Sequence, residues 1–321
     1  MEDMLGRKVN YLRISVTDLC NMRCKYCMPE RGIPKKAHDE ILSIEEIFQV
    51  VKAGYKLGID KVRITGGEPL IRKGILKLIE SIASLESIKD IAITTNGALL
   101  KQYAASLKAA GLKRVNISLD TLNEQKYTEI TRGGRLGDVL EGIEAAKAVG
   151  LFPLKLNVVV IGGFNDNEVE DFVKWTQDEA IDVRFIELMP IGQASNWAKS
   201  NFISNEVIKE RLPELIPIYT GDRSSPAKYF KLSNGSGKVG FINPISSHFC
   251  KYCNRIRLTA DGRLKPCLHS NQEIDIKTVL REDEERLEEV LQKAIQAKPA
   301  AHHLNEADNQ PIYRDMFRIG G

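Results

Sequence analysis

"SIEEIFQVVKAGYKLGIDKVRITGGEP", residues 43–69, joins a helix to a strand that ends in a polar turn. We predict a helix over 43–58 because its apolar side chains recur at helical spacing on one face: Ile44, Ile47, Phe48, Val51 and Tyr55. Ser43 and Glu46 can form a capping box at its start, and Gly58 suits its end. The short apolar run 61–65 is typical of a buried parallel strand.

The first two-thirds of the chain repeat this alternation on both sides of the quoted stretch. We predict strands over 9–17, 61–65, 90–95, 114–119, 154–161 and 182–189, and helices over 43–58, 73–84, 98–109, 137–149 and 167–179. Short apolar strands between helices indicate a parallel sheet that is buried on both faces. The predicted fold class is α/β: an incomplete, TIM-like (β/α)6 barrel, two units short of eight, with a C-terminal α+β extension that closes the barrel mouth.

The pattern changes after Pro190, so we predict a partial barrel over 1–190 and a second region over 191–321 that packs on it. Within the second region, 233–238 is a predicted hairpin turn. Residues 255–267 are predicted as two short strands joined at Asp261 and Gly262. A charged helical segment is predicted over 276–296.

Bulk composition excludes some classes of function. The 321 residues include 46 basic and 43 acidic side chains, a net charge of +3, which gives no support to nucleic-acid binding. The N-terminus has no apolar signal-peptide core, and no uninterrupted apolar run reaches about 18 residues, so we expect no membrane span. We therefore expect a cytoplasmic protein, in which clustered cysteines are metal ligands or redox thiols more often than disulfides.

Three cysteines follow the first strand: Cys20, Cys24 and Cys27, here called the N-terminal cysteine set. They could be a redox CxxC pair with a spare thiol, or part of a zinc site. Zinc needs four ligands in a structural site, and the nearest histidine, His38, has no zinc-like spacing. An iron–sulfur cubane needs one outer ligand for each of four irons, so three cysteines would leave one iron open to a small molecule.

Three more cysteines near the other end form the C-terminal cysteine set: Cys250, Cys253 and Cys267. Taken alone, this set favours zinc, with His248 or His269 as the fourth ligand. Beside a first set that is already one ligand short, a second three-cysteine cubane becomes the better interpretation, with its open iron serving the substrate.

Polar residues gather where successive predicted strands end. They are the segments 65–69, 94–97 and 118–120, with Lys155 inside the fifth strand and Glu187 and Met189 at the end of the sixth. In parallel barrels the carboxyl ends of the strands face the active site. Each segment could be only a turn or a cap, but their shared position predicts a site.

The spacing C-x3-C-x2-C, with Tyr26 before its third cysteine and "TGGEP" at 65–69, resembles the radical S-adenosylmethionine superfamily. That resemblance implies a [4Fe-4S] cluster on the N-terminal cysteine set, with S-adenosylmethionine on the open iron and a 5′-deoxyadenosyl radical as the reactive species. It also implies that four residues contact S-adenosylmethionine: Tyr26, Gly67, Ser118 and Met189.

Two longer stretches, "YLRISVTDLCNMRCKYCMPE" (11–30) and "FCKYCNRIRLTADGRLKPCL" (249–268), and the terminal Gly-Gly are similar to the GTP 3′,8-cyclase family (the molybdenum cofactor biosynthesis protein A family). The similarity runs from residue 9 to the end, although 195–240 carries no motif. It implies conversion of GTP to 3′,8-cyclo-7,8-dihydro-GTP, the first step of molybdenum cofactor biosynthesis. A second [4Fe-4S] cluster on the C-terminal cysteine set would hold guanine.

The same resemblance implies roles for individual residues. Arg255, Ile256 and Arg257 would line the GTP site, with the two arginines as catalytic residues. Thr94 would contact the nucleotide, and Gly320 and Gly321 would reach into the active site. Two glycines can thread a narrow passage because they lack side chains.

Basic residues on the strands suit a triphosphate independently of the resemblance: Arg13, Lys61, Arg63 and Lys155. Lys61 and Arg63 lie two residues apart and should share one strand face. Alternatively, they are rim residues paired with Asp60 or Glu68.

The expected partners are GTP, an external electron donor and, as a candidate recipient of the product, the downstream cyclic pyranopterin monophosphate synthase. We expect a monomer or homodimer. Two alternatives stay open: another radical S-adenosylmethionine enzyme with an auxiliary cluster, and a zinc-containing binding protein.

Overall fold

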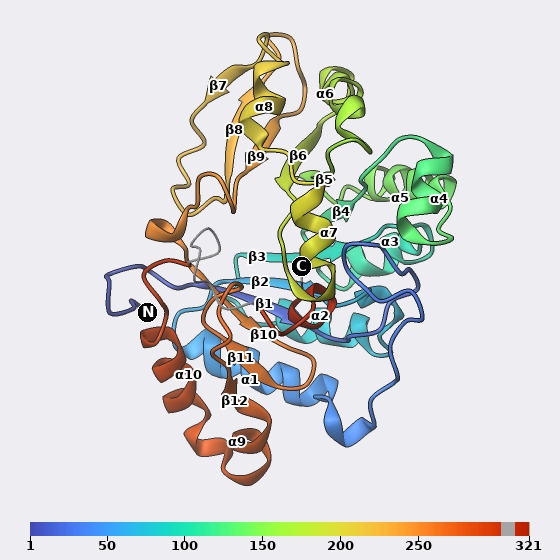
Figure 1. Ribbon diagram of the computed structural model, residues 1–321. Helices are drawn as coiled ribbons and strands as arrows, with labels where there is room; N and C mark the ends of the chain where they lie inside the picture. Colours follow the sequence, from blue (N-terminus) through green and yellow to red (C-terminus); the bar gives the residue numbers. More distant parts are fainter. Residues whose placement is uncertain (303–311, 321) are drawn as a thin grey trace.

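The computed structural model describes residues 1–302 and 312–320, and within them a single twelve-stranded sheet organises the fold (Figure 1). The strand order is β12-β11-β10-β1-β2-β3-β4-β5-β6-β9-β8-β7. None of the helices in this described part is both long and apolar enough to cross a membrane. The fold is mixed α/β with a mostly parallel sheet.

Six parallel strands in chain order form the centre of the sheet. They are β1 (Tyr11–Ser15), β2 (Lys61–Thr65), β3 (Asp90–Thr95), β4 (Arg114–Ser118), β5 (Leu154–Val160) and β6 (Ile181–Glu187). Their connecting helices are α1 (Ile44–Lys56), α2 (Ile75–Ala83), α3 (Leu100–Ala109), α4 (Glu124–Thr131), α5 (Leu136–Ala148) and α6 (Val169–Asp178). All predicted strands and helices of this region are confirmed to within a few residues at their ends, and α4 is an addition.

The predicted capping box at the start of α1 is confirmed. The Ser43 hydroxyl accepts a hydrogen bond from the Glu46 amide at 3.1 Å, and the Glu46 carboxylate accepts one from the Ser43 amide at 2.7 Å. At the other end, Gly58 adopts a positive φ of 90°, which a side-chain-bearing residue rarely adopts.

The C-terminal third of the chain extends the sheet at both edges. β10 (Arg255–Leu258) pairs in parallel with β1, followed by β11 (Arg263–Lys265) and β12 (Ile274–Asp275). At the other edge β9 (Val239–Ile242) pairs in parallel with β6, followed by β8 (Ala227–Lys231) and β7 (Ile216–Ile218). Both predicted turns are confirmed, because β8–β9 and β10–β11 are antiparallel pairs around them.

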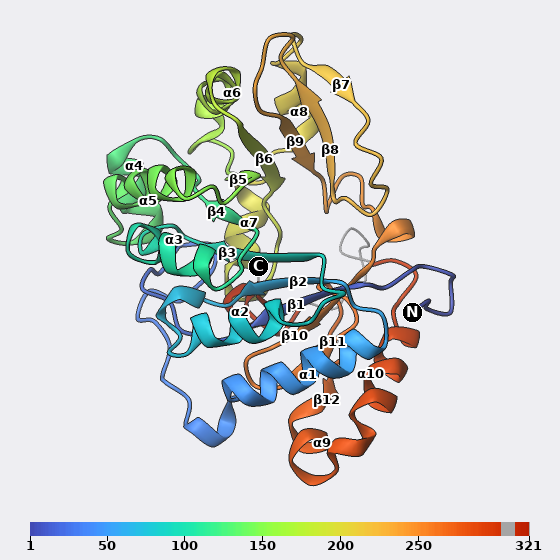
Figure 2. The same cartoon turned by 180° about the vertical axis from the view of Figure 1, so that it is seen from behind.

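The remaining helices are α7 (Ser195–Ser200), α8 (Asn205–Glu210), α9 (Ile276–Glu282), α10 (Leu287–Gln296) and α11 (Met316–Ile319). The predicted charged helical segment is thus two helices, α9 and α10, which lie beside α1 in both views (Figure 2). The chain's C-terminal end lies near the centre of the molecule, at the carboxyl ends of β1 and β2.

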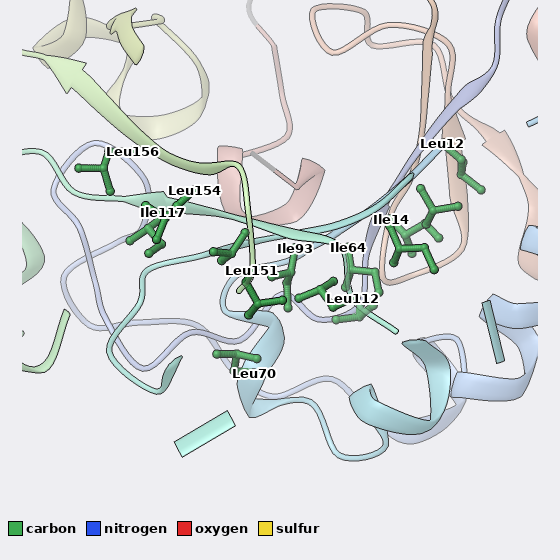
Figure 3. Packing of buried hydrophobic residues seen from close by; sticks show 14 of the residues in the cluster. Leu12, Ile14, Ile64, Leu70, Ile93, Leu112, Ile117, Leu151, Leu154 and Leu156 are labelled. Carbon is green, nitrogen blue, oxygen red and sulfur yellow. The ribbon is translucent and has the colours of Figure 1, made fainter. Parts of the chain in front are cut away.

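Alternate residues of the central strands divide the sheet into an apolar face and a polar face. The apolar side chains pack against the helices in one core, and they include Leu12, Ile14, Ile64, Ile93, Ile117, Leu154 and Leu156 (Figure 3). Burial of each such side chain stabilises the fold by roughly 1.5–3 kcal/mol. The residues between them, such as Arg13 and Arg63, face the opposite side, where the functional cavity lies.

Candidate active site

A cavity of about 280 Å³ lies over the polar face of the sheet. Its wall draws on both terminal thirds of the chain and on all six central strands or the loops that follow them. The predicted site residues that line it are Arg13, Cys20, Cys24, Tyr26, Cys27, Arg63, Gly67, Thr94, Ser118, Met189, Arg255 and Arg257.

Other predicted residues do not line this cavity. Lys155 forms an ion pair with Asp182 at 3.2 Å and contacts the Tyr229 hydroxyl. Ile256 is 1% exposed within the hydrophobic core. Lys61 and the C-terminal cysteine set are also absent from the lining, whereas Phe249 and Leu268, which adjoin Cys250 and Cys267 in sequence, belong to it.

The turn after β2 is held tightly against the cysteine-bearing loop. The Gly67 amide donates to the Thr17 carbonyl at 2.7 Å, and the Glu68 amide donates to the Leu19 carbonyl at 2.8 Å. A Cβ atom on Gly67 would lie 2.2 Å from the Leu19 carbonyl oxygen, so only glycine fits at this position. The glycine therefore sets how closely the two loops approach beside the thiols.

Glu68 connects the ends of β2 and β3 from a fully buried position. Its carboxylate accepts hydrogen bonds from the Thr95 hydroxyl and from the amides of Leu70 and Asn96, all at 2.8–2.9 Å. Burial raises the pKa of this carboxyl to about 7 despite these donors. No sequence pattern identified Glu68 as the residue that joins the ends of these two strands.

The thiols of the N-terminal cysteine set are half-buried, lie close together and line the cavity. Burial raises the pKa of Cys20 to about 11 and that of Cys27 to about 12, and it raises the pKa of Cys24 as well. The Cys20 sulfur accepts a hydrogen bond from the Met22 amide at 3.4 Å. Three sulfur donors gathered in this way fit an iron–sulfur cubane that has one iron without a cysteine.

Tyr26 is held in place by the carboxylate of Asp120, a residue predicted only as part of the polar segment 118–120 at a strand end. Its hydroxyl donates to one Asp120 carboxylate oxygen at 2.6 Å, while the other oxygen accepts from the Val159 amide at 2.9 Å. Burial raises the pKa of Asp120 to about 6. On the far wall, the Met189 sulfur lies 3.2 Å from His269 Nε2.

A row of arginines crosses the cavity floor on three adjacent strands. The strand register places Arg13 of β1 between Arg257 of β10 and Arg63 of β2. Burial, followed by the neighbouring arginines, lowers the pKa of Arg13 and brings that of Arg257 to about 10. Because each buried cation disfavours the next, this row is prepared for a ligand with several negative charges.

Arg184 is a cavity arginine that the sequence analysis missed. Its Nη2 donates to the Asn116 amide oxygen at 2.8 Å, but its buried Nε has no hydrogen-bond partner among the described residues. The buried Thr94 hydroxyl and Arg255 Nη1 likewise lack partners there. Buried polar groups are nearly always hydrogen-bonded, so these atoms are aimed at a polar ligand. The sequence signal that could have identified Arg184 is its charge between apolar neighbours in the predicted strand 182–189.

The C-terminal tail contributes Met316 and Phe317 to the cavity wall, whereas Gly320 is not among the lining residues. The Gly320 carbonyl oxygen accepts a hydrogen bond from Arg257 Nη1 at 2.6 Å, and Gly320 has a φ of 82°. A Cβ atom there would lie 2.7 Å from Thr65 Cγ2. Arg314 anchors the tail through ion pairs with Asp261 at 3.0 Å and Glu273 at 2.7 Å. Gly321 lies outside the described residues.

The C-terminal cysteine set is gathered by the short helix Cys250–Tyr252 and the end of β11. Burial raises the pKa of Cys250, and the nearby thiols of Cys267 and Cys253 add to this effect. Burial would raise the pKa of Cys253, but the charges of Lys298 and Arg255 prevail and lower it to about 7. Cys253 therefore forms a thiolate readily, and it lies beside two further thiols. Thiolates are the ligands of iron–sulfur clusters, so this set fits such a cluster.

Three imidazoles lie beside the C-terminal cysteine set. The ring centroid of His302 is 5.0 Å from that of His248 and 4.4 Å from that of His269. In the described part of the chain, no three His, Cys, Asp or Glu residues converge as ligands of a single metal ion. A cubane distributes its ligands over separate irons, so it does not require such convergence.

Known proteins resemble this chain over its whole length. Residues 14–176 match the Radical SAM superfamily, and residues 181–304 match Molybdenum Cofactor Synthesis C. A protein of Alkaliphilus oremlandii named GTP 3′,8-cyclase is 61% identical over 321 residues and is covered completely, as is this chain. Proteins of the same name are 58% identical in Alkaliphilus metalliredigens, covering 100% of both chains, and 56% identical in Peptoclostridium acidaminophilum, covering 99% of this chain and 98% of that protein.

A solved structure agrees with the fold. Streptococcus suis SuiB bound to S-adenosylmethionine superposes with a TM-score of 0.67, covering 97% of this chain and 77% of SuiB. The identity is 14%, so this likeness concerns the fold alone.

Proposed function

The chain belongs to the GTP 3′,8-cyclase family of the radical S-adenosylmethionine superfamily, and we propose that the cavity over its sheet is where GTP is cyclised. The enzyme is a GTP 3′,8-cyclase of molybdenum cofactor biosynthesis, with GTP as substrate and 3′,8-cyclo-7,8-dihydro-GTP as product. A radical enzyme of this superfamily carries a [4Fe-4S] cluster and S-adenosylmethionine. Together they supply, when bound, a radical that can remove a hydrogen atom from the substrate ribose.

One observation carries the location: a single cavity is lined both by three thiols and by a row of arginines. The thiols provide a place for a cluster, and the arginines provide charge for a triphosphate. Because both sets of side chains line one cavity, substrate and radical source can be held in contact.

Beside the N-terminal cysteine set, atoms of the protein would orient S-adenosylmethionine. The backbone at Gly67 approaches closely because it lacks a side chain, and the Tyr26 hydroxyl is held by Asp120. Ser118 and Met189 complete this wall. Their role is to hold the cofactor so that its reactive carbon faces the ribose.

Along the row of arginines, guanidinium groups would bind the phosphates of GTP. Arg13, Arg63 and Arg184 lie in the cavity wall, and planar guanidinium groups bind phosphate oxygens in pairs. Thr94 adds a buried hydroxyl that has no partner among the described residues. Lys61 and Lys155 would contribute positive potential from outside the lining.

Nearer the C-terminal cysteine set, Arg255 and Arg257 are the proposed catalytic residues, with the backbone of Ile256 between them. Their charges can stabilise a developing negative charge on the base. We assign a second [4Fe-4S] cluster to the C-terminal cysteine set, beside Phe249 and Leu268 of the cavity wall. Its open iron would hold guanine. Gly320 and Gly321 would reach into this part of the active site.

The test is anaerobic incubation of reconstituted protein with GTP, S-adenosylmethionine and dithionite, followed by mass analysis. We expect 5′-deoxyadenosine and the cyclised nucleotide to form together. Formation of 5′-deoxyadenosine without any cyclised nucleotide, from protein that holds both clusters, would contradict the substrate assignment. An R263A variant is the matched control, because Arg263 lies on β11 and pairs with Asp275 away from the cavity.

Several expectations go with this proposal. The boundary near residue 190 would separate a partial barrel from the C-terminal region that closes its mouth. An external electron donor would reduce the first cluster, and cyclic pyranopterin monophosphate synthase is the candidate recipient of the product. The enzyme is expected to be cytoplasmic, and a monomer or homodimer. Gel filtration tests the oligomeric state, and a pull-down with that synthase tests the transfer of product.

A further inference from the structure

Lys298 is a buried cation that the proposed reaction does not use. It follows α10, and only 5% of its surface is exposed. Its ammonium donates hydrogen bonds to the carbonyl oxygens of Arg255 at 2.8 Å and Pro266 at 2.9 Å. Its charge lies close enough to the Cys253 thiol to lower the pKa of that thiol. An ammonium has three hydrogens, and the two carbonyl groups use two of them.

The two carbonyl groups belong to chain segments that carry cysteines. Arg255 lies two residues after Cys253, and Pro266 directly precedes Cys267. Lys298 therefore joins the start of β10 to the end of β11 at the place where each segment presents a thiol. A change in its position would move two of the three sulfur donors.

The charge of Lys298 has no carboxylate partner within the described residues, where its ammonium donates to neutral carbonyl groups. Lysine is almost never buried without compensation, because removing an ammonium from water is costly. The anionic sulfur of a bound cluster is the compensation that this site offers, since the Cys253 thiol lies close enough to feel the charge of Lys298.

Arg7 fixes the segment that carries Lys298. Its guanidinium donates to the carbonyl oxygens of Lys298 at 3.1 Å, Pro299 at 2.8 Å and Cys250 at 3.0 Å. Arg7 is itself 8% exposed and is paired with Asp3 at 2.6 Å. The N-terminal residues of the chain thereby hold Lys298 beside both segments that carry the C-terminal cysteine set.

We propose that Lys298 is a positioning residue for the cluster of the C-terminal cysteine set, and that its charge raises the reduction potential of that cluster. This inference rests on the second cluster of the proposed function. Reduction adds one negative charge to a cluster, and a fixed cation beside a sulfur ligand favours the more negative state.

The experiment is an EPR-monitored redox titration of the full chain, in a background where the N-terminal cysteines are replaced by alanine. K298M removes the charge and the donors at similar length, and K298R restores both. The control is K293M, since Lys293 lies on α10 with its side chain 62% exposed and paired with Glu289. We expect K298M to shift the equilibrium at least tenfold towards the oxidised cluster, which is about 59 mV for one electron.

The outcomes are distinct. A lower midpoint potential in K298M, with K293M unchanged and K298R shifted back towards the parent, supports the proposal. Loss of iron from K298M but not from K298R, with unchanged thermal unfolding, also supports it. Equal potentials in K298M and the parent, or loss of iron from both Lys298 variants, overturns it. If the parent itself binds zinc or no metal at the C-terminal set, the second-cluster assignment fails instead.

Discussion

The two cysteine sets have the same number of thiols, but only the C-terminal set contains a thiol whose pKa is lowered. The N-terminal thiols lie near Glu68 and Asp120, and burial raises their pKa values, as it does for Cys250. In the C-terminal set, Lys298 and Arg255 lower the pKa of Cys253 to about 7 against the effect of burial. The protein therefore prepares a thiolate at the second site, whereas at the first site the positive charge must come from the bound metal and its ligand.

Removing one thiol from each set should have the largest effect and should separate the two functions. We expect C24A to abolish both 5′-deoxyadenosine and the cyclised nucleotide, because the cluster that binds S-adenosylmethionine is lost. C250A should keep S-adenosylmethionine binding but lose GTP turnover. Iron and sulfide analysis with product mass analysis checks both variants. Retained cyclase activity in C250A, or zinc at that site, would contradict a second cluster.

Arg257 links the C-terminal set to the cavity, so its loss should have the next largest effect. R257A removes a cation from the row beside Arg13 and the donor to the Gly320 carbonyl. We expect kcat/KM for GTP to fall by about 10²- to 10³-fold, as for loss of one preorganised donor. R263A should stay within about twofold of the parent. Equal activities of R257A and R263A would remove Arg257 from the catalytic groups.

The tail should be sensitive to a single methyl group. G320A places a Cβ atom 2.7 Å from Thr65 Cγ2 at a φ of 82°. A left-handed backbone costs an L-residue roughly 1–2 kcal/mol, so turnover should fall about 5- to 30-fold because the observed tail conformation is disfavoured by that amount. Deleting Gly320 and Gly321 should abolish turnover.

A matched control distinguishes the clash from the backbone cost. Gly163 has a φ of 73°, and a Cβ atom added to it would have no atom within 4 Å, so G163A carries the backbone cost alone. Thermal unfolding of both variants should remain within a few degrees of the parent. If product formation by the tail-deleted protein is unchanged, the tail has no role in turnover.

The smallest effect is a pH dependence in iron-free protein. With a pKa of about 7, Cys253 is a thiolate over most of the range above pH 7, so its alkylation rate should level off near pH 8. Cys20, with a pKa of about 11, should alkylate at a rate that still rises through pH 10. Mass spectrometry of iodoacetamide-treated peptides measures both profiles. Identical midpoints for the two cysteines would mean that the surroundings of the sets do not differ electrostatically.

The sheet was predictable from sequence because its strands are short apolar runs between helices. Helix α4 was missed since only Tyr127, Ile130 and Thr131 of its eight residues are buried, which leaves little periodicity to detect. The pairing of β10 with β1 and of β9 with β6 was also missed. Such pairings depend on contacts between distant segments, and local patterns carry no information about them.

Residue type alone was enough to select the three N-terminal cysteines and Gly67, which the structure brings together in the wall of one cavity. Their roles there stay predictions. Site prediction was less complete for cations. The ion pair of Lys155 depends on the register that sets it opposite Asp182, and the sequence does not show that register. Lys298 lies in an ordinary polar segment, "QAKPA", and only the tertiary structure brings it to Cys253.

The pairing of β1 with β10 has a consequence for folding. Arg13 and Arg257 are neighbours in space but come from opposite ends of the chain, so their strands must meet by a long-range closure that is slow relative to local βα assembly. Docking of β10 also brings buried like charges together. A polyanion that binds across both strands favours the docked state by mass action. GTP should therefore act as a ligand that promotes completion of the sheet, because it would favour docking of the strand that carries Arg255 and Arg257, the proposed catalytic residues.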